Sequence, residues 1–122
     1  MRVLIVEDDP LTAADIAASL EDGGHNVVGI AENFSEAMAV ADCMPLELAI
    51  VDIGLRDGGT GMQVVRALRA RHFVRSLVIS AEREIRSKAH LAGPVGYIPK
   101  PARPNEILRV IRSLGAPAEA FC

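Results

Sequence analysis

Short apolar runs alternate along the chain with longer segments in which apolar residues recur every three or four positions. The run LAIV at 48–51 holds four apolar residues in succession. Such a run is typical of a strand buried on both faces, as in parallel sheets covered by helices. Four other short runs share this character. The predicted strands are 3–6, 27–31, 48–51, 77–80 and 95–98.

The intervening segments carry the helical period and end at glycine or proline. Asp9 is expected to cap the first helix, and Gly115 and Pro117 are expected to end the last. The segment 83–92 has only a thin apolar stripe and is the weakest of the five. The predicted helices lie between Pro10 and Gly23, between Ser35 and Pro45, around 62–68, over about 83–92, and between Pro104 and Gly115.

Strands and helices alternate five times without a change of composition, and no internal repeat interrupts them. This pattern predicts one three-layer α/β domain with a five-stranded parallel sheet, five helices and right-handed crossovers. The domain is expected to occupy residues 1–115, followed by a short C-terminal tail at 116–122.

Composition narrows the class of protein. Of 122 residues, 50% are hydrophobic but only 3% aromatic, so the core must be aliphatic. The net charge of −3 offers nucleic acid no bulk attraction, although a small basic face is not excluded. No apolar stretch is long enough to span a membrane, and the apolar run after Met1 is too short for a secretory signal. With two cysteines, Cys43 and Cys122, a disulfide framework is not expected, and a cytoplasmic location is predicted.

Polar residues follow four of the five predicted strands directly. Since the carboxyl ends of parallel strands lie along one edge of the sheet, these residues are expected to converge. The residues are Glu7 and Asp8 after the first strand, Asp52 after the third, Ser80 at the end of the fourth and Lys100 after the fifth.

These residue types suit phosphoryl transfer. Three carboxylates held together repel one another unless a cation neutralises them, and Mg²⁺ is the cation that hard oxygen ligands favour. A metal, the ammonium of Lys100 and the hydroxyl of Ser80 are what the oxygens of a transferring phosphoryl group require. Asp52 can then act as the nucleophile and form an acyl phosphate. The alternative is a structural ion-pair network at the sheet edge.

Four motifs together resemble the receiver domain of two-component response regulators, over residues 2 to about 114. The resemblance implies a flavodoxin-like fold with strand order 2-1-3-4-5. The motifs are VLIVEDDP at 3–10, Val51-Asp52, Ser80-Ala81, and YIPKP at 97–101.

Residue by residue, the resemblance implies that Asp52 is the phosphoacceptor. Glu7 and Asp8 correspond to the acidic pair, and they, with Asp52 and the backbone carbonyl of Gly54, are the implied Mg²⁺ ligands. Lys100 matches the family's lysine of the site.

Three further residues match the family pattern. Ser80 corresponds to the switch hydroxyl and Tyr97 to the switch aromatic, although a half-buried strand tyrosine with no such role is the alternative. The Lys100–Pro101 bond is implied to be cis, a minority state that its surroundings must hold.

The implied function is a switch that catalyses only its own phosphorylation and dephosphorylation and is not otherwise an enzyme. The phosphoryl donor is a phosphohistidine of a sensor histidine kinase or of a histidine phosphotransfer protein. Output is by binding another protein or by passing the phosphoryl group on, with no DNA-binding output domain. The fourth helix, fifth strand and fifth helix form the face through which such domains signal or form a homodimer.

The sequence departs from the family pattern in two places. The distance from Ser80 to Lys100 is about two residues shorter than usual, and the glycine-rich loop at 54–61 lacks the proline often found there. The resemblance also implies that Glu82, two residues beyond Ser80, stands at a position that tunes how fast the phosphoryl group is lost.

Two rival functions remain at this level. One is a phosphorylation-independent scaffold of the same fold, and the other is a flavin or nucleotide binder, which the lack of a phosphate-binding glycine motif after the first strand disfavours. An arginine-rich face on the third helix either binds an acidic partner or is merely solvated. Its residues are Arg66, Arg69 and Arg71, with Arg75 beyond the helix.

Overall fold

The structure is a computed structural model that describes residues 1–53, 60–81 and 96–120. Five strands and four helices lie in these segments, and the helix predicted over 83–92 lies outside them. The strands are β1 Arg2–Val6, β2 Asn26–Ala31, β3 Leu48–Asp52, β4 Arg75–Ser80 and β5 Gly96–Pro99. The helices are α1 Pro10–Asp22, α2 Phe34–Cys43, α3 Thr60–His72 and α5 Pro104–Ala120.

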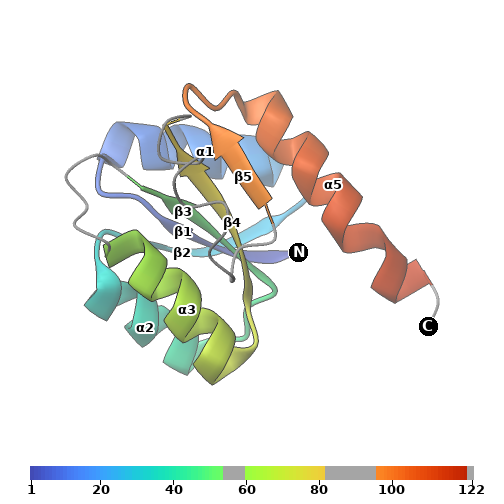
Figure 1. Cartoon of the computed structure of the whole chain (residues 1–122). Helices are drawn as coiled ribbons and strands as arrows, with labels where there is room; N and C mark the ends of the chain where they lie inside the picture. The colour runs from blue at the N-terminus through green and yellow to red at the C-terminus, as the bar shows by residue number, and fades with distance from the viewer. Residues whose placement is uncertain (54–59, 82–95, 121–122) are drawn as a thin grey trace.

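The five strands form the predicted parallel sheet, in the order β2-β1-β3-β4-β5 that the family resemblance implied. Helices α2 and α3 cover one face of this sheet, and α1 and α5 cover the other (Figure 1). The result is a three-layer arrangement in which helices cover the central strands on both faces.

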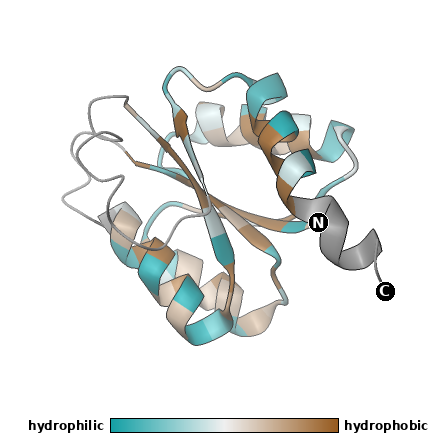
Figure 2. Ribbon diagram, turned by 45° about the vertical axis from the view of Figure 1, so that its right-hand side comes forward, coloured by the Kyte–Doolittle hydropathy of each residue, from teal (hydrophilic) through white to brown (hydrophobic). Residues whose placement is uncertain are grey.

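Alternation along the strands divides the core into two clusters, one on each face of the sheet. In β1, Val3 and Ile5 pack toward α1 and α5, whereas Leu4 and Val6 pack toward α2 and α3. In β3, Leu48 and Ile50 pack like Val3 and Ile5, and the two strands pair Val3 with Leu48. The central strands are hydrophobic on both sides, which Figure 2 shows as a brown centre of the ribbon.

The start of α1 follows the predicted capping pattern. Asp9 has an extended backbone, its carboxylate accepts a hydrogen bond from the amide of Leu11 at 3.2 Å, and Pro10 is the first helical residue. At the other end Gly23 is the C-cap, and Gly24 takes a φ of 88°, a conformation that favours glycine. The predicted bounds of this helix are confirmed.

Helix α2 begins earlier than predicted. Asn33 rather than Ser35 is the N-cap, and its side-chain oxygen accepts a hydrogen bond from the amide of Glu36 at 2.9 Å. Glu36 in turn accepts from the amide of Glu32 at 2.9 Å, so that both groups satisfy free amides at the helix start. The predicted start at Ser35 was wrong because the reciprocal pair at 33 and 36 is the stronger cap.

Helix α5 runs to Ala120, past the residues predicted to end it. Gly115 costs a helix only about 1 kcal/mol relative to alanine. Pro117 has no backbone N–H and so removes one backbone hydrogen bond of the helix, that to the carbonyl of Ser113. The prediction that Gly115 and Pro117 end the helix was therefore wrong. None of the described helices is both long and apolar enough to cross a membrane.

Candidate functional site

A cleft of about 750 Å³ opens at the carboxyl ends of the strands, between α1 and the segment that leads into α5. Asp52 is the last residue of β3 and lies on the same side of that strand as Leu48 and Ile50, toward α1 and α5. The cleft is lined by Glu7, Asp9, Thr12, Asp15, Ile16, Asp52, Ile79, Lys100, Pro101, Ala102, Pro104 and Ile107. Three residues predicted for the site, Glu7, Asp52 and Lys100, thus share one cavity.

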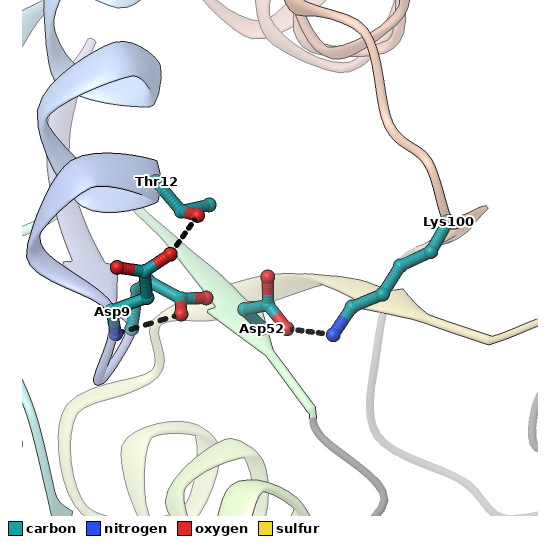
Figure 3. A network of polar contacts seen from close by, with 5 residues as sticks. Asp9, Thr12, Asp52 and Lys100 are labelled. Carbon is teal, nitrogen blue, oxygen red and sulfur yellow. Dashed lines mark hydrogen bonds and ion pairs between the residues drawn. The ribbon is translucent and has the colours of Figure 1, made fainter.

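Asp52 and Lys100 form an ion pair across this cleft. The Lys100 Nζ lies 2.6 Å from Asp52 Oδ1, and Figure 3 shows the two side chains pointing toward one another. The Asp52 side chain is 9% exposed and that of Lys100 is 38% exposed, so the carboxylate is the buried partner. The amide of Lys100 donates to the carbonyl of Ser80 at 2.9 Å, which ties the lysine to the end of β4. The Lys100–Pro101 peptide bond is cis, as expected.

Glu7 is the buried acid of the cleft, with 6% of its surface exposed. Its Oε1 accepts a hydrogen bond from the amide of Asp9 at 2.9 Å, while its Oε2 is buried without a hydrogen-bond partner. Burial, and then the neighbouring carboxylate of Asp52, raises the pKa of Glu7 to about 8, against the lowering effect of the Asp9 amide. Asp8 contributes a smaller increase to this pKa, and its own side chain is exposed. The cleft therefore holds a carboxyl group that resists ionisation.

Asp9 and Thr12 also line the cleft, although the sequence analysis assigned Asp9 only a capping role. The Thr12 hydroxyl donates to Asp9 Oδ2 at 2.6 Å, and this bond, together with the Leu11 amide, lowers the pKa of Asp9 (Figure 3). An aspartate followed three residues later by threonine is the sequence signal of this arrangement. Both Asp9 oxygens are engaged at the helix start, so the carboxylate is fixed there.

The described residues of the cleft supply some, but not all, of the predicted ligands of a divalent cation. No group of three or more Asp, Glu, His or Cys residues among the described residues is arranged to enclose an ion. Mg²⁺ does not require one, since it is commonly bound through one or two carboxylates and retains several waters. The unpartnered Oε2 of Glu7 and the nearby Asp52 carboxylate supply such donors and would lose their mutual repulsion. Gly54, the predicted backbone ligand, lies outside the described residues.

Ser80 and Tyr97 lie beside the cleft rather than in its lining. Ser80 is 2% exposed at the end of β4, one residue beyond Ile79, which pairs with Asp52. Tyr97 pairs with Val78 and packs, half-buried, against the cluster under α2 and α3; burial raises the pKa of its phenol. Since alternation along β4 puts Val78 and Ser80 on one face, Ser80 and Tyr97 share that face. The two side chains therefore lie on the same face of the sheet, near the carboxyl ends of adjacent strands.

Comparison with known proteins gives the family. Residues 3–112 match the family model for the response regulator receiver domain. The chain belongs to this family. Solved receiver domains share this fold. The family match gives no support to a flavin or nucleotide binder.

Individual receivers are similar over most of this chain. The Phyllosphere-induced regulator PhyR of Methylorubrum extorquens is 36% identical over 111 residues, which are 90% of this chain and 42% of that protein. The crystal structure of PhyR from Brucella abortus has a TM-score of 0.84 and 31% identity, covering 98% of this chain and 49% of that one. The receiver domain of a modulated diguanylate cyclase from Desulfovibrio desulfuricans has a TM-score of 0.78 and 32% identity, covering 92% and 90%. The chain spans about half the length of the curated relatives it matches.

Proposed function

We propose that this receiver accepts a phosphoryl group on Asp52 from a phosphohistidine of a sensor histidine kinase or a histidine phosphotransfer protein. The observation that carries the proposal is the pairing of Lys100 Nζ with Asp52 Oδ1 at 2.6 Å inside a cleft that opens to solvent. The pair places a carboxylate nucleophile beside a cation. The carboxylate attacks phosphorus, and the cation stabilises the negative charge of the phosphoryl oxygens.

In the transfer, an Asp52 carboxylate oxygen attacks phosphorus opposite the imidazole nitrogen. The new P–O bond forms as the P–N bond breaks, and the electron pair of the broken bond stays on the imidazole, which takes up a proton. The Lys100 ammonium, which lies beside Asp52 Oδ1, neutralises the carboxylate before the transfer. It then neutralises the negative charge of the phosphoryl oxygens once the group is on Asp52. The protein catalyses this change only on itself, and on this proposal it has no other substrate.

Glu7, Asp8 and Asp52, with the Gly54 carbonyl, would hold Mg²⁺, which supplies neutralisation of the phosphoryl charge when bound. The buried Glu7 Oε2 without a hydrogen-bond partner supports this assignment. Glu7 must give up its proton before it can act as a ligand, and its pKa of about 8 means that the metal competes with that proton.

The output follows from the shared face of Ser80 and Tyr97. The phosphoryl oxygens recruit the Ser80 hydroxyl, and Tyr97 turns toward the space that this opens, which shifts a pre-existing equilibrium between two surfaces. The surface then binds another protein, or the phosphoryl group is passed on. The half-buried position of Tyr97 supports this role, since a phenol that is neither fully packed nor fully solvated can occupy two positions.

The test is phosphorylation by acetyl phosphate in the presence of Mg²⁺, followed by intact-mass measurement. The wild-type chain should gain one phosphoryl group, and Asp52→Asn should gain none. Asp15→Asn is the matched control, because Asp15 is an exposed aspartate on the rim of the same cleft, and it should be modified like wild type. A wild-type chain that gains nothing and does not bind beryllofluoride would refute the proposal and leave the phosphorylation-independent scaffold.

A further inference from the structure

A second hollow lies on the opposite face of the sheet, between α2 and α3. Its volume is about 420 Å³, and it shares no lining residue with the Asp52 cleft. The two helices approach one another at their C-terminal ends, where His72 Nε2 lies 2.9 Å from Asp42 Oδ1. The lining residues are Phe34, Gln63, Arg66, Ala67, Ala70 and Arg71.

The hollow combines an apolar floor with cations at its rim. Phe34 and Ala67 are half-buried, and the guanidinium of Arg71 lies over the Phe34 ring, 6.0 Å from its centroid. A guanidinium stacked on an aromatic ring keeps the N–H groups at its edge free to donate, and a carboxylate accepts two of them at once. Arg66, also exposed, stands on the same hollow.

The α3 side of the hollow carries cations and no carboxylate. Residues 60–81 include four arginines and His72 but no aspartate or glutamate. Among the described residues, no carboxylate forms an ion pair with Arg66 or Arg71. The carboxylate of Glu36 on α2 is engaged with the amide of Glu32 at the helix start. Helix-dipole stabilisation accounts for basic residues in the last turn of α3, but Arg66 precedes that turn.

We propose that this hollow docks an acidic segment of a partner protein, with one apolar side chain seated over Ala67 and Ala70 and carboxylates paired with Arg66 and Arg71. Charge complementarity selects the occupant, because Arg66 and Arg71 attract an acidic segment locally, although the whole chain has a net charge of −3. The small alanine side chains leave the room that the anchoring residue requires. The surface goes beyond the proposed phosphoryl transfer, since it includes no residue of the Asp52 cleft.

The test uses the full chain and a fluorescein-labelled synthetic peptide of repeating Glu-Glu-Leu, with binding followed by fluorescence anisotropy. Arg66→Glu and Arg71→Glu should each weaken binding by about tenfold or more, because each replaces a paired cation by a repelling anion. Arg75→Glu makes the same change of charge at an exposed arginine that does not line the hollow, and should weaken binding by no more than about threefold. A peptide of repeating Glu-Glu-Ser, which keeps the charge and lacks the anchor, should bind more weakly than the leucine peptide.

Several outcomes would overturn the proposal. An equal loss in Arg75→Glu would reduce the effect to long-range attraction, and equal binding of the serine peptide would remove the anchor. Self-association of the chain that Arg66→Glu abolishes would assign the hollow to a second copy instead. Tight binding of a single-stranded DNA oligonucleotide with the same dependence on Arg66 and Arg71 would assign it to nucleic acid. Asp52→Asn should bind the leucine peptide like wild type, so the failure of this proposal is distinguishable from that of phosphoryl transfer.

Discussion

Glu7 should make the metal-free protein lose stability as the pH rises, and Glu7→Gln should remove that dependence. The carboxyl is 6% exposed, its Oε2 has no hydrogen-bond partner, and burial and Asp52 raise its pKa to about 8. In the unfolded chain the same carboxyl has its ordinary pKa of 4.5. At any pH between 4.5 and about 8, the folded state therefore keeps the Glu7 proton and the unfolded state has lost it.

The sign and size follow from linkage. A group whose folded pKa is raised contributes its stability fully below 4.5 and loses it as the pH rises through about 8. One proton of difference is worth about 1.4 kcal/mol per pH unit. Between about pH 5.5 and about pH 7.5 the free energy of unfolding should therefore fall by about 2–3 kcal/mol because of Glu7 alone. Glutamine has the same shape and no proton to lose, so its profile should lack this fall.

The assay is urea unfolding followed by circular dichroism at several pH values, in EDTA, for wild type and Glu7→Gln. The difference between their unfolding free energies isolates Glu7, because the other titratable groups are common to both proteins. Glu21→Gln, at an exposed glutamate near the end of α1, is the matched control and should keep the wild-type dependence. Adding Mg²⁺ should stabilise wild type more at the higher pH, where the metal competes with less proton.

Parallel profiles for wild type and Glu7→Gln would refute this reasoning. They would mean that Glu7 ionises in the folded protein as it does in the unfolded chain, so that neither burial nor Asp52 disfavours its charge. The carboxylate crowding that motivates a cation in the cleft would then have no basis.

Four further substitutions test other parts of the structure, each by urea unfolding. Asp52→Asn should stabilise the metal-free protein by about 1 kcal/mol, since it removes one of the crowded carboxylates and leaves a lysine that solvent reaches. Lys100→Met should act in the opposite direction by about 1–2 kcal/mol, because the 9% exposed Asp52 carboxylate then loses its cation; the same sign for both would contradict the ion-pair argument. Gly23→Ala should cost less than about 1 kcal/mol, because its Cβ would lie 2.7 Å from Leu108 Cδ2 on α5, the end of a half-buried side chain that can turn aside; a cost above about 2 kcal/mol would mean that the Leu108 side chain is held in place. Phe73→Gly should stabilise by about 0.5–1 kcal/mol, since Phe73 has a φ of 57° and is 88% exposed; a loss would show that the ring has a packing partner.

The sheet and its strands could be predicted because each strand carries its own evidence. An unbroken apolar run such as 48–51 has to be enclosed on both faces, and only a parallel sheet between two helical layers does this. The apolar run of β1 is enclosed in the same way, since Val3 and Leu4 belong to the core clusters on opposite faces of the sheet. Strand order, in contrast, came from the resemblance to receivers and is not contained in any single run.

Helix ends were harder to predict, because their local signals compete. Asn33 and Ser35 are both acceptable caps, and the choice depends on Glu36 reaching back to the free amide of Glu32. At the other extreme, Gly115 and Pro117 are weak evidence for an end when the preceding turns of α5 bury Ile107 and Ile111 against the sheet. Phe73 has no sequence signal at all, since the position after a helix usually carries glycine where φ is positive.

The two surfaces of this domain differ in how far sequence can specify them. Asp52 and Lys100 could be placed together because each follows a parallel strand, and the carboxyl ends of such strands meet at one edge whatever the helices do. The hollow at Phe34 and Arg71 depends instead on how α2 and α3 lie against one another, with the two residues on different helices. Helical periodicity identifies an arginine-rich face of α3 but not the aromatic ring opposite it. The geometry of parallel strand ends thus allows the proposed phosphoryl site to be predicted from sequence, whereas the proposed docking surface, which helix packing builds, is found only in the folded chain.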